Sequence, residues 1–241
     1  MDLSVVVPVR NEAENLKPLL AEIVQAVEGL GDCEIIYVDD GSNDGTLAQL
    51  SALRQTCPRL RVLRHRTGRG QSAALLTGIR AARGAAIATL DGDGQNDPAD
   101  IPKLLHTLRE RQADTPEVMV AGHRVQRQDS AWRKFTSRIA NTVRGGLLGD
   151  HTPDTGCGLK VFPRALFMEL PQFDHMHRFL PALAQRAGAR IVGVPVNHRP
   201  RRAGVSKYGT WRRLWVGVVD LLGVIWLQRR ALAADSEEIG D

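Results

Sequence analysis

The sequence predicts an α/β fold built on a mostly parallel, Rossmann-like sheet with helices on both faces. Short apolar runs, rich in valine and isoleucine, alternate with longer stretches in which apolar side chains recur about every 3.6 residues. Polar and acidic clusters follow several of the short runs directly. Such clusters are expected where loops leave the carboxyl ends of parallel strands, which is where open α/β sheets bind ligands.

Strands and helices alternate along the first half of the chain. Each predicted strand is a short apolar run bounded by turn residues: 3–7, 34–38, 60–63, 85–90 and 117–121. Each predicted helix carries apolar residues at helical spacing, and the first ends at Gly29 and Gly31: 16–27, 47–53, 74–83 and 101–108. This order forms βαβ units, which place successive strands parallel.

The second half departs from this alternation but contains no linker or repeat, so we expect a single domain over residues 1–210. The elements predicted there are a basic helix at 131–147, a turn and short strand at 156–162, a helix at 179–187, a strand at 191–196 and a basic loop at 200–209. The acidic residues 231–241 are expected to be disordered.

An apolar run near the end of the chain predicts a C-terminal amphipathic helix at 211–230. A helix that crosses a bilayer needs about 20 mostly apolar residues, whereas this run covers 214–227 and contains Asp220. Arginines and tryptophans border it, as in helices that lie at a membrane surface. We therefore expect it to associate with a membrane or a partner protein, or else to pack on the domain.

Composition limits the classes of function. Hydrophobic residues make up 43% and charged residues 24%, which excludes a disordered or fibrous chain. The three cysteines have no metal-binding spacing and favour a reducing compartment. A net charge of +5 suits phosphates or an anionic membrane, while 5% aromatic residues, none interleaved with basic ones, argue against nucleic acid. The first residues lack the pattern of a signal peptide, so we expect a cytoplasmic protein.

Three polar clusters follow predicted strands and are expected on one edge of the sheet: 8–12 (PVRNE), 39–46 (DDGSNDGT) and 91–98 (DGDGQNDP). Clustered carboxylates repel one another unless a cation lies among them, and oxygen ligands suit Mg²⁺ or Mn²⁺. Each cluster alone is equally consistent with turn and helix-capping chemistry. The third is not an EF-hand loop, because Asn96 and Pro102 occupy positions that need Gly and Glu.

Together these motifs resemble those of the family 2 inverting glycosyltransferases, which have the GT-A fold. Within that family the chain is most similar to the dolichyl- and polyprenyl-phosphate mannosyl- and glucosyltransferases. The resemblance covers about residues 1–210, the expected catalytic domain, and also includes DTGCG at 154–158 and the basic loop at 201–208. It implies a metal-dependent hexosyltransferase that uses GDP-mannose or a UDP-sugar and transfers a hexose to a polyprenyl phosphate.

The resemblance also implies roles for individual residues. A divalent ion, Mg²⁺ or Mn²⁺, would neutralise the departing nucleoside diphosphate and be bound by Asp91, Asp93 and Gln95. The residues implied in nucleotide-sugar binding are Pro8, Val9, Asn11, Glu12, Asp39, Asp40, Asp91, Arg201 and Lys207. The residues implied in catalysis are Asp93, Arg124, Arg133, Ser137 and Asp154. Among the latter, Arg124, Arg133 and Ser137 would hold the acceptor phosphate, and Asp154 would orient it or act as a base.

A phosphate acceptor is already a nucleophile, because its second pKa is near 6, so positioning would matter more than a base. The enzyme would lie at the cytoplasmic face of a membrane, held peripherally by residues 211–230, by a small membrane protein, or by both. Two alternatives stay open: transfer to a sugar hydroxyl, which needs a carboxylate base, and a non-catalytic module that senses nucleotides or metals.

Two further polar segments have plain alternatives. Asp174, His175 and His177 fall near the acceptor side by chain order, but we favour the interpretation that they are surface or capping residues. The arginines at 199–202 fit either a diphosphate-binding loop or a solvated run of charge.

Overall fold

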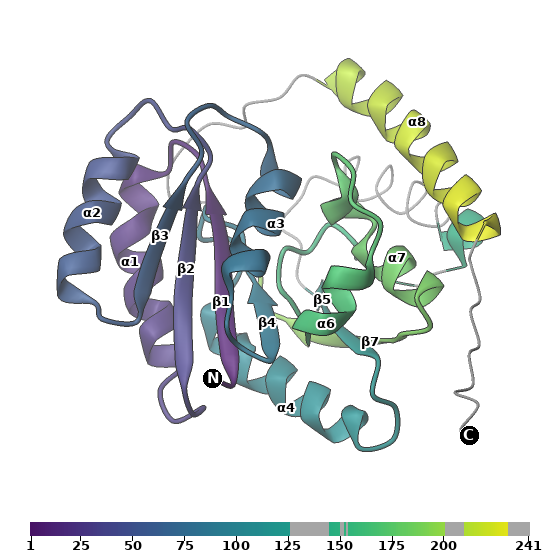
Figure 1. Ribbon diagram of the computed structural model, residues 1–241, viewed down its shortest axis with the longest axis horizontal. Helices are drawn as coiled ribbons and strands as arrows, with labels where there is room; N and C mark the ends of the chain where they lie inside the picture. Colours follow the sequence, from purple (N-terminus) through teal and green to yellow (C-terminus); the bar gives the residue numbers. More distant parts are fainter. Residues whose placement is uncertain (126–144, 150–151, 153, 201–209, 231–241) are drawn as a thin grey trace, which may run out of the picture.

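The computed structural model describes residues 1–125, 145–149, 152, 154–200 and 210–230, with only the backbone described at 210–215. Within these residues a single seven-stranded sheet has the order β3-β2-β1-β4-β6-β5-β7, with helices on both of its faces (Figure 1). The predicted α/β class is therefore confirmed. The predictions for 131–144, the loop 201–209 and the tail 231–241 lie outside the described residues.

The first half forms a parallel sheet as predicted. Strand β1 (Leu3–Val9) lies between β2 (Cys33–Asp39) and β4 (Ala86–Thr89), and β2 pairs with β3 (Leu60–Arg64). Every residue of β1 and β2 is buried, which explains their continuous apolar sequences. Strand β1 ends two residues later than predicted. Strand β2 extends one residue beyond each predicted end, and its last residue is Asp39.

The helices of this half connect the parallel strands. They are α1 (Ala13–Ala26), α2 (Thr46–Thr56), α3 (Gln71–Ala81) and α4 (Ile101–Gln112), the last preceded by the short 3₁₀ helix η1 (Pro98–Asp100). Asp97 caps η1 by accepting a hydrogen bond from Ala99 N at 3.0 Å. Helix α3 begins three residues earlier than predicted, and this places Gln71 and Ser72 at its first turn.

The second half inserts an antiparallel strand into the sheet. Strand β6 (Lys160–Pro163) runs antiparallel between β4 and β5 (Val118–Arg124), and β5 pairs in parallel with β7 (Arg190–Val196). The sheet is thus mostly parallel, as predicted, but mixed. The remaining elements are α6 (Arg164–Glu169), η2 (Met176–Arg178), α7 (Leu180–Arg186) and α8 (Thr210–Arg229). Helix α6 is too short for its periodicity to be recognised in the sequence.

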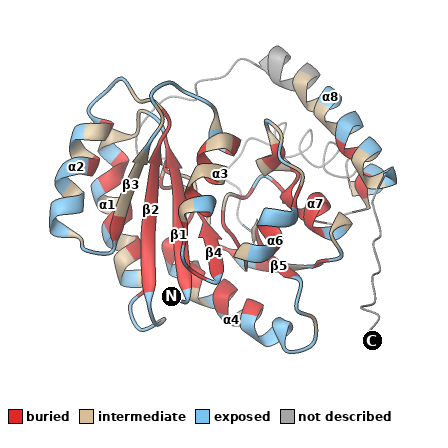
Figure 2. Ribbon diagram, viewed as in Figure 1, coloured by how far each residue is buried: buried red, intermediate tan, exposed pale blue. Residues whose placement is uncertain are grey.

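The core consists of two apolar clusters, one on each face of the sheet (Figure 2). Leucines and isoleucines of α1 and α4 fill the first cluster, and those of α3, α6 and α7 fill the second. Both layers extend over β1 and β4, so the loops at the carboxyl ends of these strands rest on a fully packed base.

Helix α8 packs one face on the second cluster and turns the other face outward. Val224 is fully buried, and Arg186 Nε of α7 donates a hydrogen bond to the carbonyl of Leu227 at 2.8 Å. The outward face carries large apolar side chains that are 42–62% exposed: Val218, Val219, Leu222 and Trp226. Among the described residues, no helix combines the length and the apolar character that crossing a bilayer requires.

Candidate active site

The first two predicted clusters form one hydrogen-bonded unit at the carboxyl ends of β1 and β2. The backbone N–H of Asn11 donates to Ser42 Oγ at 2.8 Å, and that of Glu12 donates to Thr46 Oγ1 at 2.9 Å. Asn11 also has a left-handed φ of 53°. An asparagine tolerates this conformation, and here it turns the chain from the strand toward the neighbouring cluster.

Asp40 joins this unit to the first turn of α3. One carboxylate oxygen accepts a hydrogen bond from Arg69 N at 2.7 Å and the other accepts one from Gly70 N at 2.8 Å, while His65 Nδ1 lies 2.7 Å away. Burial alone would raise the pKa of Asp40, but these hydrogen bonds outweigh it and hold the pKa below its usual value. Gly70 has a φ of 91°, which explains why a glycine precedes the helix.

The neighbouring predicted residues at this edge are part of the supporting structure. Asp39 is fully buried and accepts a hydrogen bond from Ser42 N at 3.0 Å. The side chain of Val9 is buried in the core, and its carbonyl accepts a hydrogen bond from Asp40 N at 2.9 Å. Gly92 lies directly against Pro8 and Val9, so the third cluster contacts the first.

The third cluster begins at Asp91, immediately after β4. Gln71 Nε2 donates a hydrogen bond to Asp91 at 2.8 Å, which links this cluster to the α3 turn that Asp40 holds. Burial and the nearby charge of Asp93 raise the pKa of Asp91 to about 6. A Cβ atom at Gly158 would overlap the Asp91 carboxylate, so the glycine at this position lets the 154–158 loop approach.

The residues Asp91, Asp93 and Gln95 fit a hard divalent cation by their chemistry. Two carboxylates lie close enough to repel each other, and a cation between them would relieve that repulsion. All the side-chain donors are oxygens, which Mg²⁺ and Mn²⁺ prefer. Within the described ranges no group of three or more His, Cys, Asp or Glu side chains forms a metal site, so Gln95 and substrate oxygens would have to complete the coordination.

Arg124, at the end of β5, forms a bidentate ion pair with Asp154. Arg124 Nε donates to one carboxylate oxygen at 2.6 Å and Nη2 donates to the other at 2.8 Å. The backbone N–H of Arg124 lies 3.2 Å from the same carboxylate. Because both oxygens of Asp154 are engaged, this carboxylate orients the guanidinium and is poorly suited to remove a proton.

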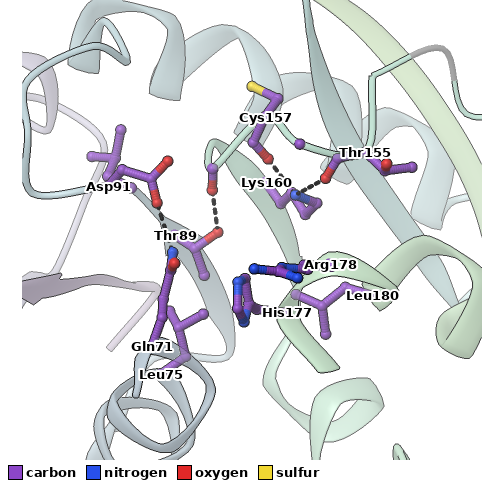
Figure 3. Close-up of a pocket in the computed structure, with 13 residues that line it drawn as sticks. Gln71, Leu75, Thr89, Asp91, Thr155, Cys157, Lys160, His177, Arg178 and Leu180 are labelled. Carbon is purple, nitrogen blue, oxygen red and sulfur yellow. Dashed lines mark hydrogen bonds between the residues drawn. The ribbon is translucent and has the colours of Figure 1, made fainter. Parts of the chain in front are cut away.

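A cavity of about 200 Å³ opens beside Asp91 (Figure 3). Its walls come from the start of α3, the end of β4, the 155–158 loop, β6 and η2. The polar side chains that reach it include four that sequence reasoning did not place at the site: Gln71, Lys160, His177 and Arg178. A lysine inside the apolar run of β6 was a signal of a buried charge, but it did not reveal what that charge faces.

The interpretation of His177 as a surface or capping residue is wrong. Its ring lines the cavity, and its Nδ1 lies 2.8 Å from Ser72 Oγ on α3. Burial, together with the neighbouring charges of Arg178, Lys160 and His175, lowers the pKa of His177 to about 3. Asp174 is exposed, as expected, whereas His175 lies 3.0 Å from Asp220 on α8.

Four predicted site residues lie outside the described part of the chain: Arg133, Ser137, Arg201 and Lys207. The residue just before the basic loop is described, and it is not a solvated charge. Arg199 pairs with Glu22 at 2.9 Å and with Asp97, and thereby ties this segment to α1 and to the DGDGQNDP cluster.

Comparison with known proteins gives a consistent result. Residues 4–170 match Glycosyl transferase family 2. A dodecaprenyl-phosphate galacturonate synthase of Rhizobium johnstonii is 37% identical over 95% of this chain and 68% of its own length. An undecaprenyl-phosphate 4-deoxy-4-formamido-L-arabinose transferase of Pseudomonas paraeruginosa is 37% identical over 88% and 62%, respectively. The chain thus spans about two thirds of the length of these curated relatives.

Solved structures share the fold at low sequence identity. A mannosyltransferase from Pyrobaculum calidifontis, in complex with GDP-Man and Mn²⁺, superposes with a TM-score of 0.66 at 22% identity and covers 97% of this chain and 65% of its own. Glucosyl-3-phosphoglycerate synthase from Mycobacterium tuberculosis, with Mg²⁺ and UDP, gives 0.69 at 19% identity, with coverages of 94% and 79%. The fold is therefore that of GT-A glycosyltransferases, and the chain belongs to glycosyl transferase family 2.

Proposed function

We propose that this protein transfers a hexose, with inversion, from GDP-mannose or a UDP-sugar to a polyprenyl phosphate at the cytoplasmic face of a membrane. The observation that carries the proposal is the continuous polar edge that runs from Asn11 and Asp40, through Gln71, to Asp91 and the Arg124–Asp154 pair. The two relatives named above act, by their names, on a dodecaprenyl and an undecaprenyl phosphate, which supports a lipid phosphate as acceptor.

On the donor side, the β1 and β2 loops would bind the nucleotide. Asn11, Glu12 and the backbone beside Asp39 and Asp40 line the edge where a base and ribose would lie, and Asp40 would act by holding the α3 turn in place. Pro8 and Val9 would support this surface from the core side, where Val9 is buried. Arg201 and Lys207 would approach the diphosphate, whose charge they match.

Asp91, Asp93 and Gln95 would hold Mg²⁺ or Mn²⁺. When bound, the cation would neutralise the charge that develops on the departing diphosphate. Gln71 would fix the Asp91 carboxylate through its 2.8 Å hydrogen bond, and the closely packed Gly158 would limit its movement. The complexes of the neighbouring folds with Mn²⁺ or Mg²⁺ support this assignment.

On the acceptor side, an oxygen of the lipid phosphate would attack the anomeric carbon of the sugar. The bond from that carbon to the diphosphate would break, and its electron pair would leave with the nucleoside diphosphate. Arg124, oriented by Asp154, would hold the phosphate together with Arg133 and Ser137. No proton has to be removed from a dianionic phosphate, so positioning and charge neutralisation would carry most of the rate.

Transfer to a sugar hydroxyl is the less favoured alternative. Such an acceptor needs a carboxylate base, and the candidate carboxylate, Asp154, has both oxygens engaged by Arg124. The exposed apolar face of α8 suits a peripheral membrane location with the lipid acceptor nearby.

The test is a transfer assay with the full chain, polyprenyl phosphate, Mg²⁺ or Mn²⁺, and a panel of radiolabelled nucleotide sugars. We expect label in the lipid phase with at least one donor, and about a hundredfold less with Asp93→Asn. Glu110→Gln is the matched control, because this exposed carboxylate lies on α4 away from the site. Label that enters only soluble sugar acceptors would refute the proposal, and so would full activity of the Asp93 variant.

A further inference from the structure

The first turn of α3 holds two parts of the cavity wall at once. Gln71 donates a hydrogen bond to Asp91 at 2.8 Å, and the next residue, Ser72, contacts His177 of η2. Ser72 is buried, so its hydroxyl meets the His177 side chain away from bulk water. One helical turn therefore fixes the proposed cation ligand and the His177 ring relative to each other.

The hydroxyl of Ser72 makes two contacts with His177. Its Oγ accepts a hydrogen bond from the backbone N–H of His177 at 3.3 Å and lies 2.8 Å from Nδ1 of the ring. Within the described part of the chain this hydroxyl has no further partner. Because a buried hydroxyl needs an acceptor for its own proton, the O–H of Ser72 donates to Nδ1, which must then be the unprotonated ring nitrogen.

This contact fixes the tautomer of the ring. Burial and the neighbouring cations lower the pKa of His177 to about 3, so the imidazole is neutral at physiological pH and carries one N–H. Since Nδ1 accepts, the proton is on Nε2. No described residue forms a hydrogen bond with Nε2, and this atom is not enclosed by the protein, so its N–H reaches the open space of the cavity.

The other polar side chains of the wall are already engaged. Thr89 Oγ1 donates to a backbone carbonyl at 2.7 Å, and the ammonium of Lys160 donates to two backbone carbonyls. Arg178 also has an interaction partner. His177 thus offers the cavity a neutral N–H that no other group in the described ranges uses.

The position of the cavity indicates which part of a substrate meets this N–H. Under the proposed function, on which this inference rests, Asp91 lies where the diphosphate and its cation bind, and the moiety attached to that diphosphate is the donor sugar. The cavity volume of about 200 Å³ suits one monosaccharide and not a complete nucleotide sugar. Leu75 and Leu180 add apolar surface on which the C–H groups of a sugar ring can pack, while a few polar groups fix its orientation.

We infer that His177 is a specificity-determining residue, whose Nε2–H donates a hydrogen bond to one hydroxyl oxygen of the transferred sugar. Ser72 is a positioning residue, because it orients the ring and keeps the proton on Nε2. A sugar that lacks this hydroxyl would leave the N–H in the cavity without an acceptor. A site built to bind a hydroxyl in this way rejects the analogue that lacks it.

The test compares nucleotide sugars with analogues that lack a single hydroxyl. Binding of UDP-glucose, UDP-galactose, GDP-mannose and other nucleotide sugars to the full chain with Mg²⁺ is measured by calorimetry. The tightest-binding donor is then compared with its deoxy analogues, one for each hydroxyl of the sugar, both in binding and in kcat/KM for transfer to polyprenyl phosphate. We expect the loss of one particular hydroxyl to weaken both by about tenfold to a hundredfold.

Two substitutions of His177 connect this preference with Nε2. The amide nitrogen of glutamine reaches about as far as Nε2, whereas that of the shorter asparagine reaches only about as far as Nδ1. His177→Gln should therefore keep kcat/KM for the intact donor within about fivefold, and His177→Asn should lower it by about tenfold to a hundredfold. In His177→Asn the critical deoxy analogue should react as well as the intact donor to within about threefold, because the hydrogen bond is already lost.

Ser72→Ala tests the positioning role. Without the hydroxyl the ring is free to turn and to move its proton, so this variant should show a smaller loss, about threefold to tenfold, again only for donors that carry the critical hydroxyl. His106→Gln and His106→Asn, at an exposed histidine of α4, are the matched controls and should change nothing. Thermal unfolding verifies that each variant is folded, and Ser72→Ala takes the place of His177→Asn if the latter is not.

The outcomes separate the possible acceptors of the N–H. If His177→Asn weakens the binding of UDP or GDP alone as much as that of the nucleotide sugar, the ring serves the diphosphate, and the inference is wrong. A change confined to the KM for polyprenyl phosphate would assign the ring to the acceptor and refute it equally. Refutation would also follow from nucleotide sugars that bind no better than the nucleoside diphosphate, or from a deoxy analogue that loses as much in His177→Asn as in the unmodified chain. If binding depends on one hydroxyl through His177 but no sugar reaches the lipid, the proposed function fails while the inference about His177 stands.

Discussion

Arg124 and Asp154 are joined by two side-chain hydrogen bonds of 2.6 and 2.8 Å, and both side chains are largely buried. The pair connects the end of β5 to the loop before β6, a distance of 30 residues along the chain. It therefore fixes Arg124, which we propose holds the acceptor phosphate, relative to the Asp91 cluster, and without Asp154 the buried guanidinium would lose both of these hydrogen bonds.

Removal of one partner of this pair should lower the free energy of unfolding more than removal of both partners. Asp154→Ala should lower the free energy of unfolding by about 3 kcal/mol, because it leaves the Arg124 guanidinium buried without its counter-charge. The double variant Asp154→Ala, Arg124→Met should recover part of this loss. Urea denaturation of the unmodified chain, the two single variants Asp154→Ala and Arg124→Met, and the double variant measures the difference. Additive losses in this cycle would show that the pair is not coupled as the geometry indicates.

A methyl group at position 158 should disturb the Asp91 carboxylate. Because an added Cβ would overlap this side chain, Gly158→Ala should lower kcat/KM by about tenfold or more with only a modest effect on stability. Gly217→Ala on α8 is the control, since nothing lies within 4 Å of its added Cβ. Equal activity of the two variants would mean that the close contact with Asp91 has no functional effect.

Burial of His177 should make the fold less stable in acid. Its pKa is about 3 in the folded state and about 6.5 when unfolded, so between these values the unfolded chain binds more protons. The contribution of His177 is complete above pH 6.5 and is lost as the pH falls toward 3, by up to about 1.4 kcal/mol per pH unit.

The measurement is the urea-unfolding free energy from pH 7.5 to 4.5, compared between the unmodified chain and His177→Gln. The difference between the two isolates the imidazole from the other groups that titrate in this range, and it should shrink as the pH falls. His106→Gln, at an exposed histidine, should leave the pH dependence unchanged. A constant difference between the His177 variant and the unmodified chain would contradict the assigned burial.

The parts of the fold that follow from local pattern were predictable. The strands before Asn11, Asp40 and Asp91 are continuous apolar runs, and a parallel sheet brings their carboxyl ends together. The antiparallel β6 was not predictable as such, because pairing direction leaves no mark on a strand of four residues. That strand carries Lys160 to the site and brings Gly158 against Asp91.

The position of His177 in the cavity was also not predictable from the sequence. Its partner, Ser72, is 105 residues away in the chain, and η2 has only three residues. Nothing in the local sequence FDHMHRF distinguishes a histidine that enters a cavity from one that caps a turn. The sequence could therefore indicate which loops meet at the carboxyl edge of the sheet, whereas the residues that form the wall of the cavity required the tertiary structure.

The proposed function depends above all on a divalent cation bound by Asp91, Asp93 and Gln95, at the point where the three motif loops meet. The most direct measurement is anomalous X-ray diffraction from crystals of this chain grown with Mn²⁺ and a nucleoside diphosphate. We expect an anomalous peak within coordination distance of the Asp93 carboxylate and of the diphosphate oxygens. A nucleotide bound with no manganese at these residues, or with manganese elsewhere in the fold, would contradict it.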